Sequence, residues 1–188
     1  MAARNRTVRI IAGRWRGRRL RFPDTPDLRP TADRRRETLF NWLGPDLGGC
    51  RCLDLFAGSG ALGFEAASRG ATTVVFVESA RAALDALESN RRALAATTVE
   101  IVGAPVERYL RRPPSAPFDI VFLDPPFARP ALATTAIEAL GEHWLAPAAC
   151  IYIESPARAA PVAVRAEWTL ARETRGGDAV GRLYRAPG

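Results

Sequence analysis

The chain has 188 residues, 47% of them hydrophobic, and a formal net charge of +7. This length suits one ordinary domain with a small appendage, and every apolar run is shorter than the roughly 20 residues that cross a bilayer. A single histidine and three cysteines, Cys50, Cys52 and Cys150, do not build a common zinc site, so we expect no metal and a reducing, cytoplasmic setting.

The positive charge is concentrated at the N-terminus. Residues 1–36 hold 12 arginines against three acidic residues, a balance of +9, whereas residues 37–188 have a balance of −2. A local excess of arginine suits a polyanion-binding surface, because each neutralised phosphate releases counterions. Since the chain contains no lysine, the clustering is more informative than the choice of arginine, and it points to a nucleic acid.

The first predicted elements form a basic extension. Residues 7–22 alternate apolar and basic side chains around Gly13 and Gly17, which predicts a twisted hairpin. Prolines punctuate the next segment, and Thr31 suits the N-cap of a helix that ends near Leu43. We therefore expect residues 1–44 to form the extension and residues 45–188 to form the main domain.

From residue 51 onward, short buried strands alternate with amphipathic helices. Strands are expected at 52–56, 73–78, 99–102, 118–123 and 150–154, with helices between them, at 80–95, 106–110 and 131–140 among others. This rhythm predicts an α/β fold with a doubly wound, mostly parallel sheet. Two further strands, 167–173 and 179–185, flank a turn at 175–178 and predict a C-terminal antiparallel hairpin.

A glycine-rich loop follows the first strand of this α/β unit. Asp54 precedes Gly58, Gly60 and Gly63, which complete a G-x-G-x-x-G pattern that lets backbone approach a ligand. A tight turn without a ligand would explain it too, and a nicotinamide enzyme competes, since Glu78 ends the next strand and suits ribose hydroxyls. However, a carboxylate at Asp54 repels pyrophosphate and attracts a cofactor with a cationic end.

The order of acidic strand end, glycine loop and second acidic strand end resembles the class I methyltransferases that use S-adenosylmethionine. This resemblance implies a Rossmann-like, seven-stranded sheet. At the position of the family's adenine-binding polar residue stand Gly103 and Ala104, so adenine recognition is expected to use backbone groups or apolar packing. The implied cofactor-binding residues are Asp54, Phe56, Ala57, Gly58, Ser59, Gly60, Glu78 and Ser79.

The second motif is Asp124-Pro125-Pro126-Phe127, which follows the predicted strand 118–123. An exocyclic amine is a poor nucleophile because its lone pair is delocalised into the ring. Acceptors such as the Asp124 carboxylate and the Pro125 carbonyl would orient that lone pair and stabilise the developing charge, and Phe127 could stack on the base. Although an ordinary turn would also fit, the motif resembles the (D/N)-P-P-(F/Y/W) signature of amino-methyltransferases, so residues 124–127 are the predicted catalytic loop.

The N-terminal segments 8–20 and 28–43 closely resemble the RsmD family, and the likeness extends over nearly the whole chain. It implies transfer to the N2 of guanine in 16S ribosomal RNA of the small subunit, at guanine 966. The family pattern has an apolar residue where this chain has Arg35. For Trp15, base stacking and hairpin packing are equally expected. The predicted RNA-binding residues are Arg9, Arg14, Trp15, Arg16, Arg18, Arg19, Arg29, Thr31 and Arg34.

Two alternatives stay open at this stage. The same reaction could act on adenine N6 in DNA or RNA, since the catalytic motif leaves the base undefined. A protein of this fold could also bind RNA during ribosome assembly without turnover. Nothing in the sequence requires a dimer, and we expect a monomer.

Overall fold

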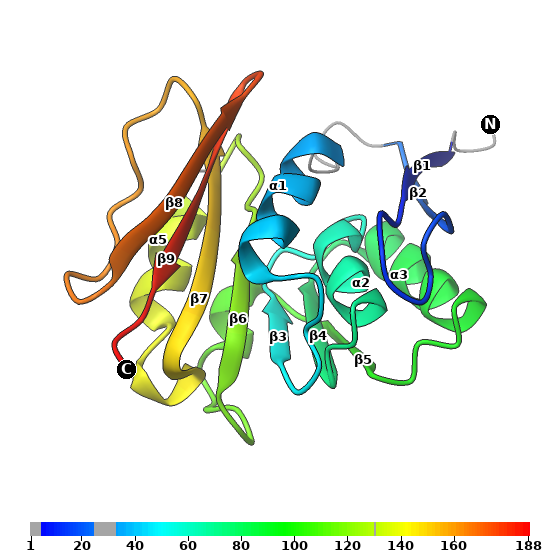
Figure 1. The fold of residues 1–188 in the computed structure, drawn as a ribbon, viewed down its shortest axis with the longest axis horizontal. Coiled ribbons are helices and arrows are strands. Elements are labelled where there is room, and N and C mark those ends of the chain that lie inside the picture. Colours follow the sequence, from blue (N-terminus) through cyan, green and yellow to red (C-terminus); the bar gives the residue numbers. More distant parts are fainter. Residues whose placement is uncertain (1–4, 25–32, 130) are drawn as a thin grey trace.

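The computed structural model describes residues 5–24, 33–129 and 131–188 (Figure 1). Its main sheet has seven strands in the order β5-β4-β3-β6-β7-β9-β8. These strands are β3 (Arg51–Asp54), β4 (Thr73–Glu78), β5 (Val99–Gly103), β6 (Phe118–Leu123), β7 (Leu145–Pro156), β8 (Thr169–Gly176) and β9 (Ala179–Arg185). The helices are α1 (Asp33–Leu43), α2 (Ala61–Ser68), α3 (Arg81–Ala93), α4 (Val106–Tyr109) and α5 (Ala131–Ala139), with a 3₁₀ turn at Glu142–Trp144.

The strand directions confirm the predicted α/β fold. β3 pairs in parallel with β4 and β6, and β6 pairs in parallel with β7. β9 runs antiparallel to both β7 and β8, which makes the predicted C-terminal hairpin. β7 is longer than the predicted strand 150–154, because it begins at Leu145, which pairs with Phe118, and its pairing with β9 continues to Pro156.

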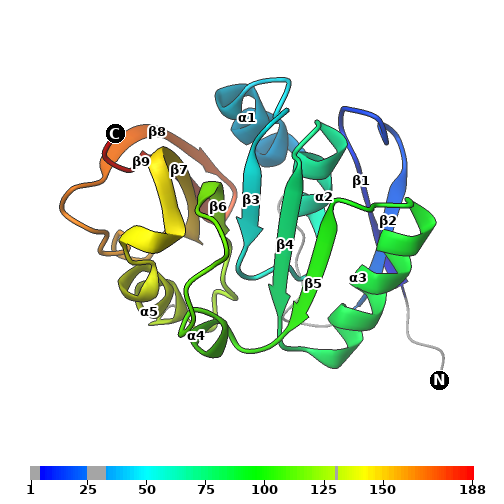
Figure 2. The same ribbon diagram turned by 90° about the horizontal axis from the view of Figure 1, so that it is seen from below.

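Helices cover both faces of the sheet (Figure 2). Alternate strand residues such as Cys52, Phe76 and Phe122 pack into one core cluster with α1, α2 and α3. Their neighbours in the strands pack into a second cluster with α4 and α5. The near-continuous apolar strands are therefore explained by burial on both faces. Within the described ranges, none of the helices is both long and apolar enough to cross a membrane.

The N-terminal hairpin of β1 (Asn5–Arg9) and β2 (Arg19–Pro23) forms its own two-stranded sheet against α2 and α3 (Figure 1). The Glu65 carboxylate accepts hydrogen bonds from the backbone of Ile11 and Ala12 at 2.7 and 2.9 Å. Asn90 both donates to and accepts from the backbone of Arg21, at 2.8 and 3.0 Å. The hairpin is therefore held in a fixed position on the main domain.

Candidate active site

A cavity of about 810 Å³ opens at the carboxyl ends of β3, β4, β6 and β7. This is the edge at which ligands of open α/β sheets bind. The cavity brings together both predicted motifs, which are 70 residues apart in sequence between Asp54 and Asp124. The predicted cofactor and catalytic residues that line it are Asp54, Phe56, Ala57, Gly58, Ser59, Glu78, Ser79, Asp124, Pro125, Pro126 and Phe127.

Gly60 is the one predicted cofactor residue that is not among the lining residues. Its φ of +76° favours glycine, and a Cβ there would lie 2.6 Å from the Phe64 ring and 2.7 Å from Leu87. A Cβ at Gly63 would lie 2.0 Å from the Phe76 ring. These two glycines therefore allow the loop and α2 to pack on the sheet, and the cofactor contact of Gly60 stays a prediction.

Glu78 fixes the shape of the glycine loop. One carboxylate oxygen, Oε2, accepts a hydrogen bond from the backbone N–H of Gly58 at 2.9 Å. The other, Oε1, accepts from Ser79 and Ala80, both at 2.7 Å. Because a carboxylate has about four acceptor positions, it can still accept from ligand hydroxyls. The acid thus joins the end of β4 to the loop after β3.

Asp54 is a buried carboxylate, 1% exposed, at the end of β3. Its Oδ2 accepts from the Gly63 N–H at 3.2 Å, while Oδ1 has no hydrogen-bond partner among the described residues. Burial, followed by the negative charges of Asp124 and Glu78, raises the pKa of Asp54 to about 8. A buried acceptor of this kind is costly unless a donor reaches it. The site therefore favours a ligand with a cationic amine.

Glu154, which the sequence reasoning missed, joins the same group of carboxylates. Leu123 pairs with Ile153, so Asp124 and Glu154 follow at adjacent strand ends, and both line the cavity. Glu154 is 3% exposed, and burial together with the charge of Asp124 raises its pKa to about 8. A signal was present: like β3 and β4, the apolar run 151–153 ends in an acid.

Arg35 is the counter-ion that makes this buried acid tolerable. Its Nη2 lies 3.0 Å from Glu154 Oε1, and the Tyr152 hydroxyl donates to Glu154 Oε2 at 3.0 Å. The Nη1 of Arg35 donates to the Gly176 carbonyl at 2.6 Å. Arg35 thus ties α1, β7 and the β8–β9 hairpin together beside the cavity. Arg35, which stands where the family pattern has an apolar residue, therefore has a structural role in this chain.

Most of the predicted RNA-binding arginines are available at the surface. Trp15 is the exception among the predicted RNA-binding side chains: it is 8% exposed, packs in the core, and is covered by the Arg14 guanidinium 4.0 Å from its ring centroid. Hairpin packing is therefore favoured over base stacking. Arg29 and Thr31 lie outside the described residues. The exposed members of the predicted set are Arg9, Arg14, Arg16, Arg18, Arg19 and Arg34.

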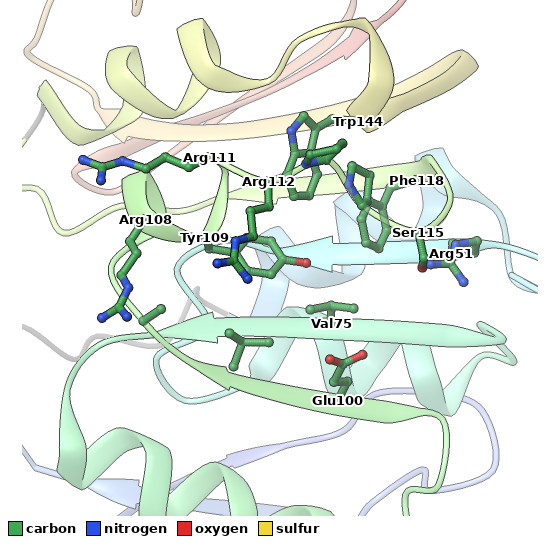
Figure 3. A pocket seen from close by; sticks show the side chains of 14 residues that line it. Arg51, Val75, Glu100, Arg108, Tyr109, Arg111, Arg112, Ser115, Phe118 and Trp144 are labelled. Carbon is green, nitrogen blue, oxygen red and sulfur yellow. The ribbon is translucent and has the colours of Figure 1, made fainter.

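A second cavity, of about 520 Å³, lies on the α4 side of the sheet (Figure 3). Its floor is formed by β4 and β5, and its opposite wall by α4 and the segment that leads to β6. Ala104 lines both cavities, so they are neighbours along one segment of the chain. Four arginines and one acid, Glu100, line the second cavity.

The family model described as "Conserved hypothetical protein 95" matches residues 8–185. The chain is 46% identical over 177 residues to Ribosomal RNA small subunit methyltransferase D of Escherichia coli (strain K12), covering 94% of this chain and 89% of the relative. The protein of that description from Haemophilus influenzae is 45% identical over 181 residues, covering 94% and 93%.

Solved structures agree with this likeness. A methyltransferase candidate from E. coli has a TM-score of 0.88 and 42% identity, with 97% of this chain and 99% of that chain covered. A 16S rRNA N2 methyltransferase from Thermus thermophilus has a TM-score of 0.72 at 23% identity, with 98% and 50% covered. The latter likeness shows that the class I methyltransferase fold is shared.

Proposed function

The chain belongs to the Conserved hypothetical protein 95 family, and on that premise we propose that it methylates the exocyclic N2 of one guanine in 16S ribosomal RNA. S-adenosylmethionine is the methyl donor. The observation that carries the proposal is the meeting of four carboxylates, Asp54, Glu78, Asp124 and Glu154, around one cavity at the carboxyl edge of the sheet. The relatives described as Ribosomal RNA small subunit methyltransferase D support the RNA class.

The residues present fit this cofactor. When bound, it supplies a methyl group on a sulfonium cation. The unpartnered Oδ1 of Asp54 suits the cationic amine of its methionine portion, and Glu78 suits the ribose hydroxyls. Around Ala104 the cavity wall is apolar, with Val77 and Pro105. These apolar groups would hold the adenine, because the Ala104 N–H already bonds to the Glu78 carbonyl at 2.9 Å.

Asp124 is the catalytic residue in this proposal. It ends the buried strand β6, and Pro125 and Pro126 stiffen the loop behind it. Its carboxylate and the Pro125 carbonyl accept the two amine hydrogens, which directs the nitrogen lone pair toward the methyl group. The same carboxylate would stabilise the positive charge that develops on nitrogen while the N–C bond forms and the S–C bond of the sulfonium breaks, leaving S-adenosylhomocysteine, and it would accept the proton that the methylated nitrogen then loses. Phe127 lines the cavity and supplies a ring for the extruded base.

Glu154 favours guanine over adenine. Guanine carries an N1–H donor beside its N2 amine, whereas adenine presents an N1 acceptor beside its N6 amine. The ionised Glu154 carboxylate, which is the main form above its raised pKa of about 8, can accept the guanine N1–H and repels the adenine N1 lone pair. Arg35 and Tyr152 hold the carboxylate in place for this contact. Adenine, the first alternative, lacks the N1–H donor that the ionised carboxylate accepts, so the preference for guanine should increase as the pH rises toward 8.

Transfer of labelled methyl groups tests the proposal. Small subunits, naked 16S ribosomal RNA and duplex DNA are supplied separately, and the product nucleoside is identified by mass. N2-methylguanosine in RNA is the expected product, and mapping should place it at guanine 966. Label on DNA alone, or N6-methyladenosine, would overturn the proposal. Cofactor binding without transfer would favour an RNA-binding assembly factor.

Glu154→Gln tests the choice of base. The isosteric amide should lower kcat/KM for guanine about 10–100-fold while the affinity for S-adenosylmethionine stays unchanged. Unchanged guanine transfer would remove Glu154 from base recognition.

Residues 1–44 are the proposed RNA-binding extension. A cytoplasmic monomer is the proposed working form, and sedimentation of the purified protein checks whether it is a monomer.

A further inference from the structure

The second cavity exists because the edge of the sheet is poorly covered on one face. α3 packs beside β5 on one side, whereas on the other side the nearest helix, α4, has only four residues. The space is therefore open above Val75, Glu100 and Val102. Figure 3 shows the Tyr109 ring lying across it, with Arg108 and Arg111 toward one end and Arg51 at the other.

The arginines on and after α4 differ from those on α3 in their ion pairing. On α3, Arg91 and Arg92 pair with Glu88 at 2.8 and 2.7 Å. Arg108, Arg111 and Arg112 are exposed, and within the described residues no carboxylate is paired with them. This leaves a local excess of positive charge at the rim of the cavity, where four arginines and one acid line it.

Arg51 adds a donor at the far end of the cavity. Its guanidinium carbon lies 5.3 Å from the centre of the Phe118 ring, and Nη1 donates to the Thr73 hydroxyl at 3.2 Å. Its Nε is buried without a hydrogen-bond partner in the described part of the chain. An unsatisfied buried donor is costly unless a ligand completes it.

Aromatic side chains form the inner wall. Tyr109 lies 5.3 Å from Trp144 between ring centroids, and Trp144 stacks on Phe118 at 6.2 Å. Tyr109 is thus held by a rigid aromatic neighbour, and its ring borders the open space. Rings for stacking and guanidinium groups for phosphates are the combination by which proteins hold single-stranded nucleic acid.

We propose that this arginine-rimmed cavity binds a single-stranded segment of the RNA substrate that flanks the methylated base. Arg108, Arg111 and Arg112 bind its phosphates, and Tyr109 stacks on one of its bases. Ala104 lines both cavities, so the proposed RNA site is adjacent to the active-site cavity. The choice of RNA over another polyanion rests on the proposed function.

The test is RNA binding measured without turnover. Arg108→Gln/Arg112→Gln should weaken the binding of a single-stranded 16S fragment about 5–30-fold at low salt, with the log–log salt slope reduced by roughly 1.4. The matched control is Arg172→Gln/Arg185→Gln, which removes the same charge from exposed positions on β8 and β9. The control should change the affinity less than about twofold if the effect is local.

Ultraviolet cross-linking provides a second, independent measurement. The expected cross-link joins the RNA to the peptide that contains Tyr109, and thermal melting checks that all variants fold. Equal loss in both double variants, or no cross-link to this peptide, would overturn the proposal. Loss of activity on assembled subunits with unchanged binding of naked RNA would overturn it in favour of a ribosomal protein as the occupant.

The two proposals can fail separately. If methyl transfer to guanine occurs and both double variants bind RNA like the parent, only the second site is wrong. If the cavity variants lose RNA binding but the parent transfers no methyl group, only the methyltransferase assignment is wrong.

Discussion

The two neighbouring cavities have opposite charge because they form at different places on one sheet. The larger cavity lies at the carboxyl ends of the strands, where Asp54 and Glu78 end β3 and β4 and Glu154 lies near the end of β7. The smaller lies against the face of β4 and β5, where arginines come from α4 and the segment after it. The acids are partly or wholly buried, whereas Arg108, Arg111 and Arg112 are exposed. Position in the fold thus separates a site for a cationic cofactor from a surface for phosphates.

Asp124→Ala should give the largest single effect. Because the carboxylate stabilises charge that appears only during transfer, its loss should lower kcat about 100–1,000-fold. The affinity for S-adenosylmethionine, measured by calorimetry, should stay within about twofold, since Asp54 and Glu78 hold the cofactor. Loss of affinity in proportion to loss of rate would assign Asp124 to the cofactor site.

Asp54→Asn should affect the binding of S-adenosylmethionine, not the methyl-transfer step. Losing the charged partner of the cofactor amine should weaken the affinity for S-adenosylmethionine about 10–100-fold. The pKa of Asp54 is raised to about 8, so below that pH most Asp54 side chains carry a proton. The Asp54 carboxyl must lose this proton when the cationic amine of the cofactor binds. In the parent, affinity should therefore rise from pH 6.5 to pH 8, and the Asn variant should lack this component. Identical pH profiles would contradict the assignment.

The buried acids should also make the ligand-free protein less stable as pH rises. The pKa values of Asp54 and Glu154 are both raised to about 8, so the folded state holds protons that the unfolded state releases near pH 4. The free energy of unfolding should therefore fall between about pH 4 and pH 8. Urea titrations should show a shallower fall for Asp54→Asn and for Glu154→Gln. A parent curve that rises across this range would contradict the burial argument.

Local patterns in the sequence predicted the elements and both motifs, because apolar periodicity, glycines and strand-end acids are properties of neighbouring residues. Contacts between distant segments were not predictable. Arg35 and Glu154 are 119 residues apart, and only the packing of α1 beside β7 makes them an ion pair. Trp15 is buried because the hairpin docks on α2. The second cavity depends on α4 being too short to cover β5, which no local pattern encodes.

Added salt should affect ligand binding at the two cavities differently. The affinity for S-adenosylmethionine should show the smallest change of all these predictions. Asp54 is 1% exposed, and charges in a buried site are screened much less than exposed ones. Raising sodium chloride from about 50 to 200 mM should therefore change the affinity for S-adenosylmethionine by less than about twofold. RNA binding should weaken steeply over the same range, because counterion release governs it. A cofactor affinity that falls in parallel with RNA affinity would mean that the acidic cavity is open to solvent ions, and the contrast between the two sites would no longer hold.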